Sequence, residues 1–186
     1  MMPEISLNIL DIAENSVRAE ASLIEITVSV QPEEDTLTVT VRDDGCGMSK
    51  EQVEHVQDPF FTTRTTRKVG LGVPFFKQAA ESTGGWFQID SEKGKGTLVT
   101  AVFGLTHIDR MPLGDISATI HTLVVFNEQI DFLYTYQYGD KSFALDTREM
   151  RELLGNGISF KDKEISDFIR EYLETNKAET DGGADI

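Results

Sequence analysis

Apolar and polar residues alternate with two different periods near the start of the chain. Ile5, Ile9 and Ile12 recur at helical spacing, which predicts an amphipathic N-terminal helix. Residues 23–30 and 36–42 instead alternate apolar and polar side chains at every second position, which predicts two strands. Because only a short polar segment separates these strands, they are predicted to form an antiparallel hairpin.

The pattern continues with two more helices and two more strands up to residue 105. The helices are predicted over residues 50–56 and 71–83, and the strands over 86–92 and 97–105. Ser49 and Gln52 form a capping-box pattern before the first of these helices, and Gly84 follows the second. The order helix, hairpin, helix, loop, helix, hairpin predicts an α+β fold, a two-layer α/β sandwich with helices on one face of a mixed or antiparallel sheet.

A second set of elements begins after residue 105. Helices are predicted over 115–127, 148–155 and 162–174, and strands over 132–139 and 141–147. We therefore divide the chain into a domain over 1–105 and a small α+β extension over 106–175, whose role the sequence does not indicate. Residues 176–186 are polar and contain glycine, so they are predicted to form a disordered tail.

Net charge narrows the range of expected partners. The 186 residues include 32 acidic and 17 basic side chains, a formal net charge of −15, which argues against nucleic acid as the main ligand. The single cysteine, Cys46, excludes an intramolecular disulfide and fits a reducing cytosol. The first residues lack the basic region of a signal peptide, and no apolar run approaches the roughly 20 residues of a membrane span. These features predict a cytoplasmic protein without a nucleic-acid or membrane partner.

Two glycine-containing segments carry candidate binding chemistry. Asp43 ends a predicted strand and precedes Gly45 and Gly47, which allow positive φ angles or close approach of a ligand to the backbone. A tight strand-to-helix turn would explain this segment equally well. Gly70 and Gly72 open a predicted helix, whose free amides and dipole suit a phosphate group. The second segment lacks the lysine of a Walker loop and the third glycine of a dinucleotide fingerprint.

The first helix also carries polar residues at regular spacing. Asp11, Asn15 and Arg18 lie on one face, at positions i, i+4 and i+7. A solvated helix face is the commoner meaning of such a set. The three residues gain a chemical interpretation only together with the glycine segments.

Five short segments occur in a recognisable order within residues 5–104: DIAENSVRA, DDGCGM, DPFFTTR, VGLGV and GKGTLVTAVF. Together they resemble the ATP-binding domain of the GHKL superfamily, which contains gyrase, the heat-shock chaperone, histidine kinases and the mismatch-repair protein MutL. The resemblance implies the histidine-kinase-like ATP-binding fold, with ATP and Mg²⁺ as its ligands.

The resemblance implies roles for individual positions. Asn15 matches the asparagine whose amide oxygen ligates Mg²⁺, an ion that prefers oxygen ligands. Asp43 matches the aspartate that accepts a hydrogen bond from the exocyclic amine of adenine. This contact would favour adenine over guanine, which presents a carbonyl at that place. Matches to positions around the base, ribose and phosphates are Gly45, Gly47, Gly70, Leu71, Gly72, Gly96 and Thr97.

Residues 58–68 resemble the ATP lid of histidine kinases. Phe60 and Phe61 match the aromatic residues that anchor such a lid. Its cover would include Thr63, Arg64, Arg67 and Lys68. The three basic side chains would offset the negative charge of the triphosphate. An ordinary exposed basic loop is the alternative interpretation.

Three residues of the first helix are the catalytic candidates: Asp11, Glu14 and Arg18. Hydrolysing members of the superfamily carry a glutamate four residues before the Mg²⁺-binding asparagine, where it activates water. Asp11 is one methylene shorter, so rapid hydrolysis is not expected, and Glu14 points about 100° away around the helix. Arg18 matches a basic residue that contacts phosphate in histidine kinases.

The resemblance implies an ATP·Mg²⁺-binding kinase-like protein that stands alone, without a phosphoacceptor domain. His55, His107 and His121 are not followed by an acidic residue as the phosphorylated histidine of sensor kinases is. The γ-phosphate is therefore expected to pass to a histidine or serine of a separate partner protein. A nucleotide-gated interaction module with little turnover is one alternative, and a slow ATPase that uses Asp11 or Glu14 is another. The sequence does not decide whether the chain forms a homodimer.

Overall fold

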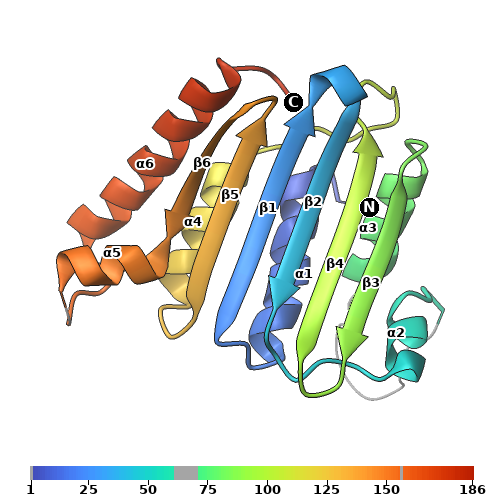
Figure 1. Ribbon diagram of the computed structural model, residues 1–186, viewed down its shortest axis with the longest axis horizontal. Coiled ribbons are helices and arrows are strands. Elements are labelled where there is room, and N and C mark those ends of the chain that lie inside the picture. The colour runs from blue at the N-terminus through green and yellow to red at the C-terminus, as the bar shows by residue number, and fades with distance from the viewer. Residues whose placement is uncertain (1, 61–70, 156) are drawn as a thin grey trace.

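The computed structural model describes residues 2–60, 71–155 and 157–186. One six-stranded sheet runs through both halves of the chain in the order β3-β4-β2-β1-β5-β6 (Figure 1). Its strands are β1 (Leu23–Gln31), β2 (Thr36–Asp43), β3 (Trp86–Glu92), β4 (Gly96–Gly104), β5 (Asp131–Tyr138) and β6 (Lys141–Asp146). Neighbouring strands are antiparallel except β1 and β5, which are parallel. The sheet is therefore mixed.

Helices cover one face of this sheet. They are α1 (Ile5–Arg18), α2 (Lys50–Val56), α3 (Gly72–Glu81), α4 (Ile116–Phe126), α5 (Thr147–Leu154) and α6 (Lys163–Asp181). In Figure 1, α1, α3 and α4 lie behind the strands, and α6 packs against α4, β5 and β6. This architecture confirms the predicted α+β sandwich. Within the described residues, no helix is both long and apolar enough to cross a membrane.

Alternation along the strands decides which face of the sheet is buried. In β1, the side chains of Ile24, Ile26, Val28 and Val30 are buried, and the residues between them are half-buried. Burial of an aliphatic side chain contributes about 1.5–3 kcal/mol. A slip of one residue would expose all four side chains, so the burial pattern fixes the register of β1 against its neighbours.

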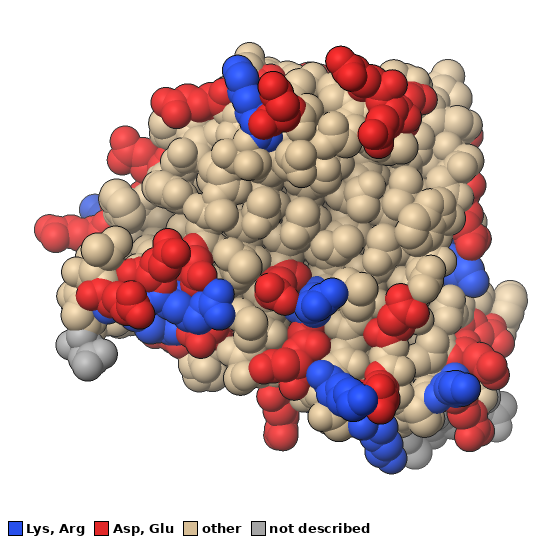
Figure 2. Space-filling view, in the orientation of Figure 1, with Lys and Arg blue, Asp and Glu red and all other residues tan. Residues whose placement is uncertain are grey.

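The open face of the sheet is uncharged at its centre. Thr27 of β1 pairs with Thr40 of β2 and with Thr135 of β5, and Thr40 pairs with Thr100 of β4. A row of threonines therefore crosses four strands. Figure 2 looks onto this face and shows an uncharged band across its upper middle, with charged side chains above and below it. Threonine suits a pleated, half-exposed surface, so its presence there does not require a covering layer.

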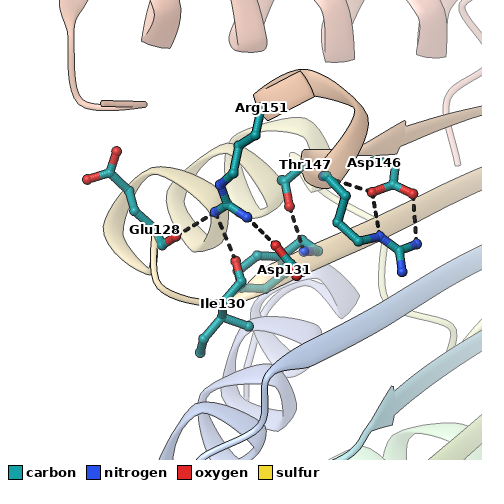
Figure 3. A network of polar contacts seen from close by, with 8 residues as sticks. Glu128, Ile130, Asp131, Asp146, Thr147 and Arg151 are labelled. Atoms are coloured by element: carbon teal, nitrogen blue, oxygen red, sulfur yellow. Dashed lines mark hydrogen bonds and ion pairs between the residues drawn. The ribbon is translucent and has the colours of Figure 1, made fainter. Parts of the chain in front are cut away.

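Residues 106–186 join the sheet of the N-terminal half directly. α5 is fastened beside β5 by Arg151, which pairs with the Asp131 carboxylate and donates to the carbonyls of Glu128 and Ile130 (Figure 3). The Thr147 hydroxyl oxygen accepts a hydrogen bond from the Phe132 backbone N–H at 2.9 Å. These contacts fix the turn before β5 and the start of α5 to each other.

The last residues are ordered, in contrast to the predicted disordered tail. α6 continues to Asp181, whose side chain is buried and accepts hydrogen bonds from the Tyr136 hydroxyl (2.9 Å) and from Lys177 Nζ (2.7 Å). The Ile186 carbonyl accepts a hydrogen bond from the Leu113 backbone N–H at 2.7 Å. The polar residues that suggested disorder are thus used in long-range hydrogen bonds, which local composition does not reveal.

Candidate functional site

The site begins where β2 ends. Asp43 is the last residue of β2, and only 9% of it is exposed. Ser16 Oγ of α1 donates to Asp43 Oδ2 at 2.5 Å, and the Gly45 backbone N–H donates to Oδ1 at 2.9 Å. A carboxylate can accept about four hydrogen bonds in total. The carboxylate is therefore held in one orientation, and its remaining lone pairs can accept from a ligand.

The turn after Asp43 is packed tightly between two other segments. The Cys46 backbone N–H donates to the Ala19 carbonyl at 3.0 Å, and the Gly94 N–H donates to the Cys46 carbonyl at 2.7 Å. Gly47 has a φ of +65°, and a Cβ atom there would lie 2.0 Å from the Glu92 carbonyl oxygen. Glycine is therefore required at this position by the approach of protein backbone.

Gly45 and Gly96 are constrained in the same way. A Cβ atom on Gly96, which has a φ of +120°, would lie 2.0 Å from the Asp43 carbonyl oxygen. At Gly45 it would lie 2.8 Å from Ala19 Cβ. The sequence interpretation placed these glycines beside the base and ribose. Gly47 and Gly96 line two adjoining hollows, and the missing side chains of all three also make room for the chain itself. Their first effect is to hold Asp43 and the β3-β4 turn together.

A cavity of about 370 Å³ opens beside Asp43 and lies on the helix side of the sheet. Its apolar wall comes from α1, α3, β3 and β4 and includes Ile12, Val73, Ile89 and Val99. Its polar groups include Asn15, Asp43 and Thr97. Ligand pockets of about 300–1,000 Å³ with apolar walls and a few fixed polar groups are typical small-molecule sites. A larger hollow of about 630 Å³ adjoins it and shares Asp43, Ile89 and Thr97.

Thr97 is brought to the site by strand pairing, since it lies opposite Asp43 between β2 and β4. Its Oγ1 is 2.8 Å from Ser91 Oγ, which also accepts a hydrogen bond from the Met48 backbone N–H at 2.8 Å. Sequence reasoning missed Ser91 because its partner Thr97 is defined only by the β3-β4 register. It also missed Ser16, although a serine on the apolar face of the first helix was a visible signal.

The polar face of α1 forms the rim of the cavity. Asn15 Oδ1 accepts a hydrogen bond from Arg18 Nη1 at 3.0 Å, and Arg18 Nη2 lies 3.4 Å from Glu14 Oε2. Arg18 is exposed, so its ion pair with Glu14 is screened by solvent and weak. Arg18 therefore connects Asn15 and Glu14 and is free to exchange these partners for a stronger anion.

Asp11 lies one turn before Asn15, at the head of α3. A Cβ atom on Gly72 would lie 2.4 Å from Asp11 Oδ2. The Asp11 carboxylate therefore packs against the first turn of α3, where unpaired amides and the helix dipole favour an anion. Leu71, the N-cap residue, supplies no side-chain cap. Asp11 and the glycine start of α3 thus lie against each other.

Most of the predicted lid lies outside the described residues. This applies to Phe61, Thr63, Arg64, Arg67, Lys68 and Gly70. Phe60 is described, and its side chain is 92% exposed rather than anchored in the core. Leu71, at the far end of the segment, is 43% exposed.

Asp44 was given no role by the sequence, and the structure supplies one. Its carboxylate accepts hydrogen bonds from the Ser22 hydroxyl, from the Ser22 backbone N–H (2.7 Å) and from the Leu23 backbone N–H (3.0 Å). Partial burial opposes ionisation of Asp44, but these hydrogen bonds outweigh it and lower the pKa of the carboxyl below its ordinary value. Asp44 therefore fastens the end of β2 to the start of β1.

The α+β sandwich thus carries a buried, pre-oriented carboxylate beside a cavity of about 370 Å³ on its helix side, an arrangement typical of a small-molecule site. Residues 4–107 match the family of histidine kinase-, DNA gyrase B- and HSP90-like ATPases, and the chain belongs to this family.

Similar proteins include histidine kinases. The chain is 35% identical over 86 residues to the sensor histidine kinase WalK of Bacillus subtilis, an alignment that covers 44% of this chain and 14% of WalK. It is 33% identical over 119 residues to the cell-division control histidine kinase PdhS of Brucella ovis, covering 56% of this chain and 11% of PdhS. The chain thus spans less than a sixth of the length of these two relatives.

Proposed function

We propose that this protein binds ATP·Mg²⁺ in the cavity beside Asp43 and transfers the γ-phosphate to a histidine or serine of a separate partner protein. The observation that carries the proposal is the Asp43 carboxylate, fixed by Ser16 and Gly45 in the wall of an apolar cavity of about 370 Å³. A carboxylate can accept a hydrogen bond from the amine of a purine, and the chain belongs to a family of ATPases.

Base selection follows from the two fixed hydrogen bonds of Asp43. With its orientation set by Ser16 and Gly45, the carboxylate can accept an N–H from the exocyclic amine of adenine. Guanine would present a carbonyl oxygen to it, and a buried acceptor would face another acceptor. Ile12, Ile89 and Val99 supply apolar surface for the faces of the base.

The residues at the rim fit a magnesium ion. Asn15 offers an amide oxygen, which is a suitable ligand for Mg²⁺ in company with phosphate oxygens. Arg18, which donates to that same oxygen, would release it and turn to a phosphate. Bound Mg²⁺ supplies charge neutralisation on the phosphates. Phosphates would approach the first turn of α3, whose N-terminal amides have no partner within the helix.

Transfer to a partner is favoured over hydrolysis by the position of Asp11. A general base for hydrolysis must reach a water molecule beside the terminal phosphate. Asp11 carries a short side chain that is packed against the backbone of Gly72, so it is poorly placed to activate water. A nucleophile brought by a partner does not depend on that carboxylate.

Calorimetry and a transfer assay test the proposal in sequence. ATP with Mg²⁺ should bind, GTP should bind at least tenfold more weakly, and removal of Mg²⁺ should weaken ATP binding in the wild type but much less in Asn15→Ala. Radiolabelled γ-phosphate from ATP should then label a partner protein in lysate of the source organism with the wild type and not with Asn15→Ala. Equal binding of ATP and GTP would contradict the site, and ATP binding without any labelled partner would contradict the transfer.

A second candidate, a nucleotide-gated interaction module, is favoured by the position of α1. This helix carries Asn15 and Arg18 and packs between α3 and α4, so it joins the cavity to the C-terminal segment. In this alternative, ATP changes the assembly of the protein without turnover. Small-angle scattering and crosslinking with and without ATP·Mg²⁺ distinguish the two functions, because only the module requires a change of assembly.

A further inference from the structure

The helix α4 lacks the charged outer face that surface helices normally have. Among the α-helices of the described residues, it alone contains no Lys, Arg, Asp or Glu. A helix that is uncharged on all sides is typical of a protein interior. Ala118, Thr122 and Phe126 of α4 are nevertheless exposed, and they recur at every fourth position. α4 therefore presents an uncharged stripe to solvent, although its composition suits a buried helix.

A groove of about 380 Å³ runs between this stripe and α1. Its apolar walls include Leu10 and Val17 of α1 and Leu123 and Phe126 of α4. The Phe126 side chain is 68% exposed, so most of its apolar surface lies in water. The groove and the exposed stripe together form one continuous surface. We call it the α1-α4 face and define it by Leu10, Val17, Ala118, Thr122 and Phe126.

The two helices that border the groove are fixed to each other at their starts. The Ser6 backbone N–H of α1 donates to the Leu113 carbonyl at 2.9 Å, and the Asp115 backbone N–H donates to Glu4 Oε2 at 3.4 Å. At the other end, Val17 and Phe126 line the groove together. α1 and α4 therefore begin and end side by side, and the groove is formed before a partner arrives.

The α1-α4 face is continuous with the cavity beside Asp43. Arg18 lines both the groove and that cavity, and Glu14, its ion-pair partner, lines the groove. Under the proposed function, Arg18 turns to a phosphate and leaves the Glu14 carboxylate without its partner. A carboxylate at this place attracts a basic side chain from a molecule that occupies the groove.

The charges around the α1-α4 face decide between a second copy of this chain and a different protein. Glu14 and Arg18 lie in the groove, and α6 carries further charged groups that interact with His121 of α4. Acidic groups outnumber basic ones: the acids are Glu4, Glu14, Asp115, Asp167 and Glu174, and the bases are Arg18 and Arg170. A two-fold interface would bring this acidic border against itself. The face is therefore suited to a different chain, with basic side chains beside an apolar stripe.

We propose that the α1-α4 face docks a basic amphipathic helix of the partner protein that receives the phosphate. A groove between two helices takes the apolar stripe of a third. Apolar side chains of the partner cover Leu10, Val17 and Phe126, and a basic side chain pairs with Glu14. α4 lies beyond the residues 4–107 that match the family, so the family match does not supply this face. The identity of the partner rests on the proposed function, whereas the docking itself requires no nucleotide.

The test uses a fluorescent helical peptide of Leu, Lys and Ala, about five turns long, whose leucines form one stripe. Its matched control has the same composition and charge, with the leucines distributed around the helix. Fluorescence anisotropy measures the binding of both peptides to the full chain without nucleotide. The striped peptide should bind about tenfold more tightly than the control. Equal binding of the two peptides would overturn the proposal, because charge alone would then explain the attraction.

Variants locate the binding on the molecule. Phe126→Ala should weaken binding of the striped peptide about tenfold, because it removes an aromatic anchor. Phe168→Ala removes a phenyl group that is 56% exposed on α6 and should change binding by less than about twofold. At the exposed Thr122, a lysine should weaken binding of the basic peptide and a glutamate should strengthen it. Equal effects of Phe126→Ala and Phe168→Ala, or no difference between the two Thr122 variants, would place the peptide elsewhere.

Two further measurements separate this inference from its alternatives. Phe126→Ala should lower the labelling of the partner from ATP while its affinity for ATP, measured by calorimetry, stays that of the wild type. Undiminished labelling would overturn the proposal. A wild-type dimer in sedimentation that Phe126→Ala dissociates would also overturn it, because a second copy would then cover the face. Preference for the striped peptide in a chain that fails to bind ATP would contradict the proposed function and leave the docking intact.

Discussion

Two carboxylates of this chain, Asp43 at the end of β2 and Asp131 at the start of β5, differ in their hydrogen-bond and ion-pair partners. Asp43 is bound by two neutral donors, Ser16 and the Gly45 amide, and lies in the wall of a cavity. Asp131 faces the Arg151 guanidinium, whose Nη2 donates to two backbone carbonyls and whose Cζ lies over the Phe160 ring, 5.1 Å from its centroid.

The difference lies in spare hydrogen-bonding capacity. The cluster around Arg151 is directed at the chain itself, because one Nη group pairs with Asp131 and the other donates to the carbonyls of Glu128 and Ile130 (Figure 3). Asp43 is oriented but not saturated, and it opens into an apolar space large enough for a ligand. A polar cluster of the first kind holds the fold together, whereas one of the second kind is available for binding. Substitutions in the two clusters should therefore affect different measurements.

The largest effect is expected for Asp43→Ala. Loss of the acceptor should lower the affinity for ATP about 100-fold, which corresponds to one charge-assisted hydrogen bond in a buried site. Calorimetry with ATP·Mg²⁺ measures this loss, and Asp140→Ala, in the exposed turn between β5 and β6, is the matched control. A change in ATP affinity of less than threefold in Asp43→Ala would show that the Asp43 cluster is no more a binding group than the Arg151 cluster.

Arg151→Met should produce the reverse result. It leaves Asp131 and two carbonyls without their donor, so the free energy of unfolding should fall by about 2 kcal/mol, discounted for the partial exposure of the ion pair. ATP affinity should stay within twofold of the wild type. Urea denaturation measures the stability, and Arg148→Met, which removes a more exposed arginine that donates to Asp146 alone, should cost less. A loss of ATP affinity equal to that of Asp43→Ala would show that the Arg151 cluster is not merely structural.

Ser16→Ala tests whether the Ser16 hydroxyl orients the Asp43 carboxylate. The carboxylate would keep its charge and the Gly45 donor but lose one of the two contacts that orient it. ATP affinity should fall about tenfold, and the preference for ATP over GTP should fall with it. Competition of both nucleotides against a fluorescent ATP analogue measures the two quantities together. A loss of affinity without any loss of base preference would mean that Ser16 does not orient Asp43.

Periodicity along the chain was sufficient to predict the elements of the fold. The predicted helix over 115–127 and the strands over 132–139 and 141–147 correspond to α4, β5 and β6. Periodicity does not specify which strands pair, so it could not show that β5 lies parallel to β1. That pairing extends the sheet with the C-terminal segment and gives the last helix an aromatic surface to cover.

The candidate site was predictable where a residue belongs to a local motif. Asp43, Asn15 and Gly72 were singled out by spacing and by resemblance, and the structure brings Asp43 and Asn15 to one cavity. Ser91 and Ser16 were missed because their partners are distant in sequence and are defined only by the sheet register and by helix packing. The reason for glycine at 47 and 96 was likewise hidden, since it is the approach of backbone from another strand.

The smallest effect is expected for Asp44→Asn. Asp44 joins the end of β2 to the start of β1, whereas its neighbour Asp43 faces the cavity. Hydrogen bonds from Ser22 and Leu23 lower the pKa of Asp44 in the folded state below the 3.8 of a free carboxyl. A carboxyl whose pKa is lower in the folded than in the unfolded state stabilises the protein at pH values above its unfolded-state pKa. This contribution disappears as the pH falls through the folded-state pKa.

The stability difference between the wild type and Asp44→Asn should therefore be constant from neutral pH to about pH 5 and should shrink below about pH 4. Urea denaturation across this range measures the difference, while ATP affinity at neutral pH should not change. A difference that grows on acidification, or a loss of ATP binding, would place Asp44 with the open cluster of Asp43. Asp43 and Asp44 would then both contribute to ATP binding. Unused hydrogen-bonding capacity would no longer distinguish a carboxylate that binds a ligand from one that stabilises the fold.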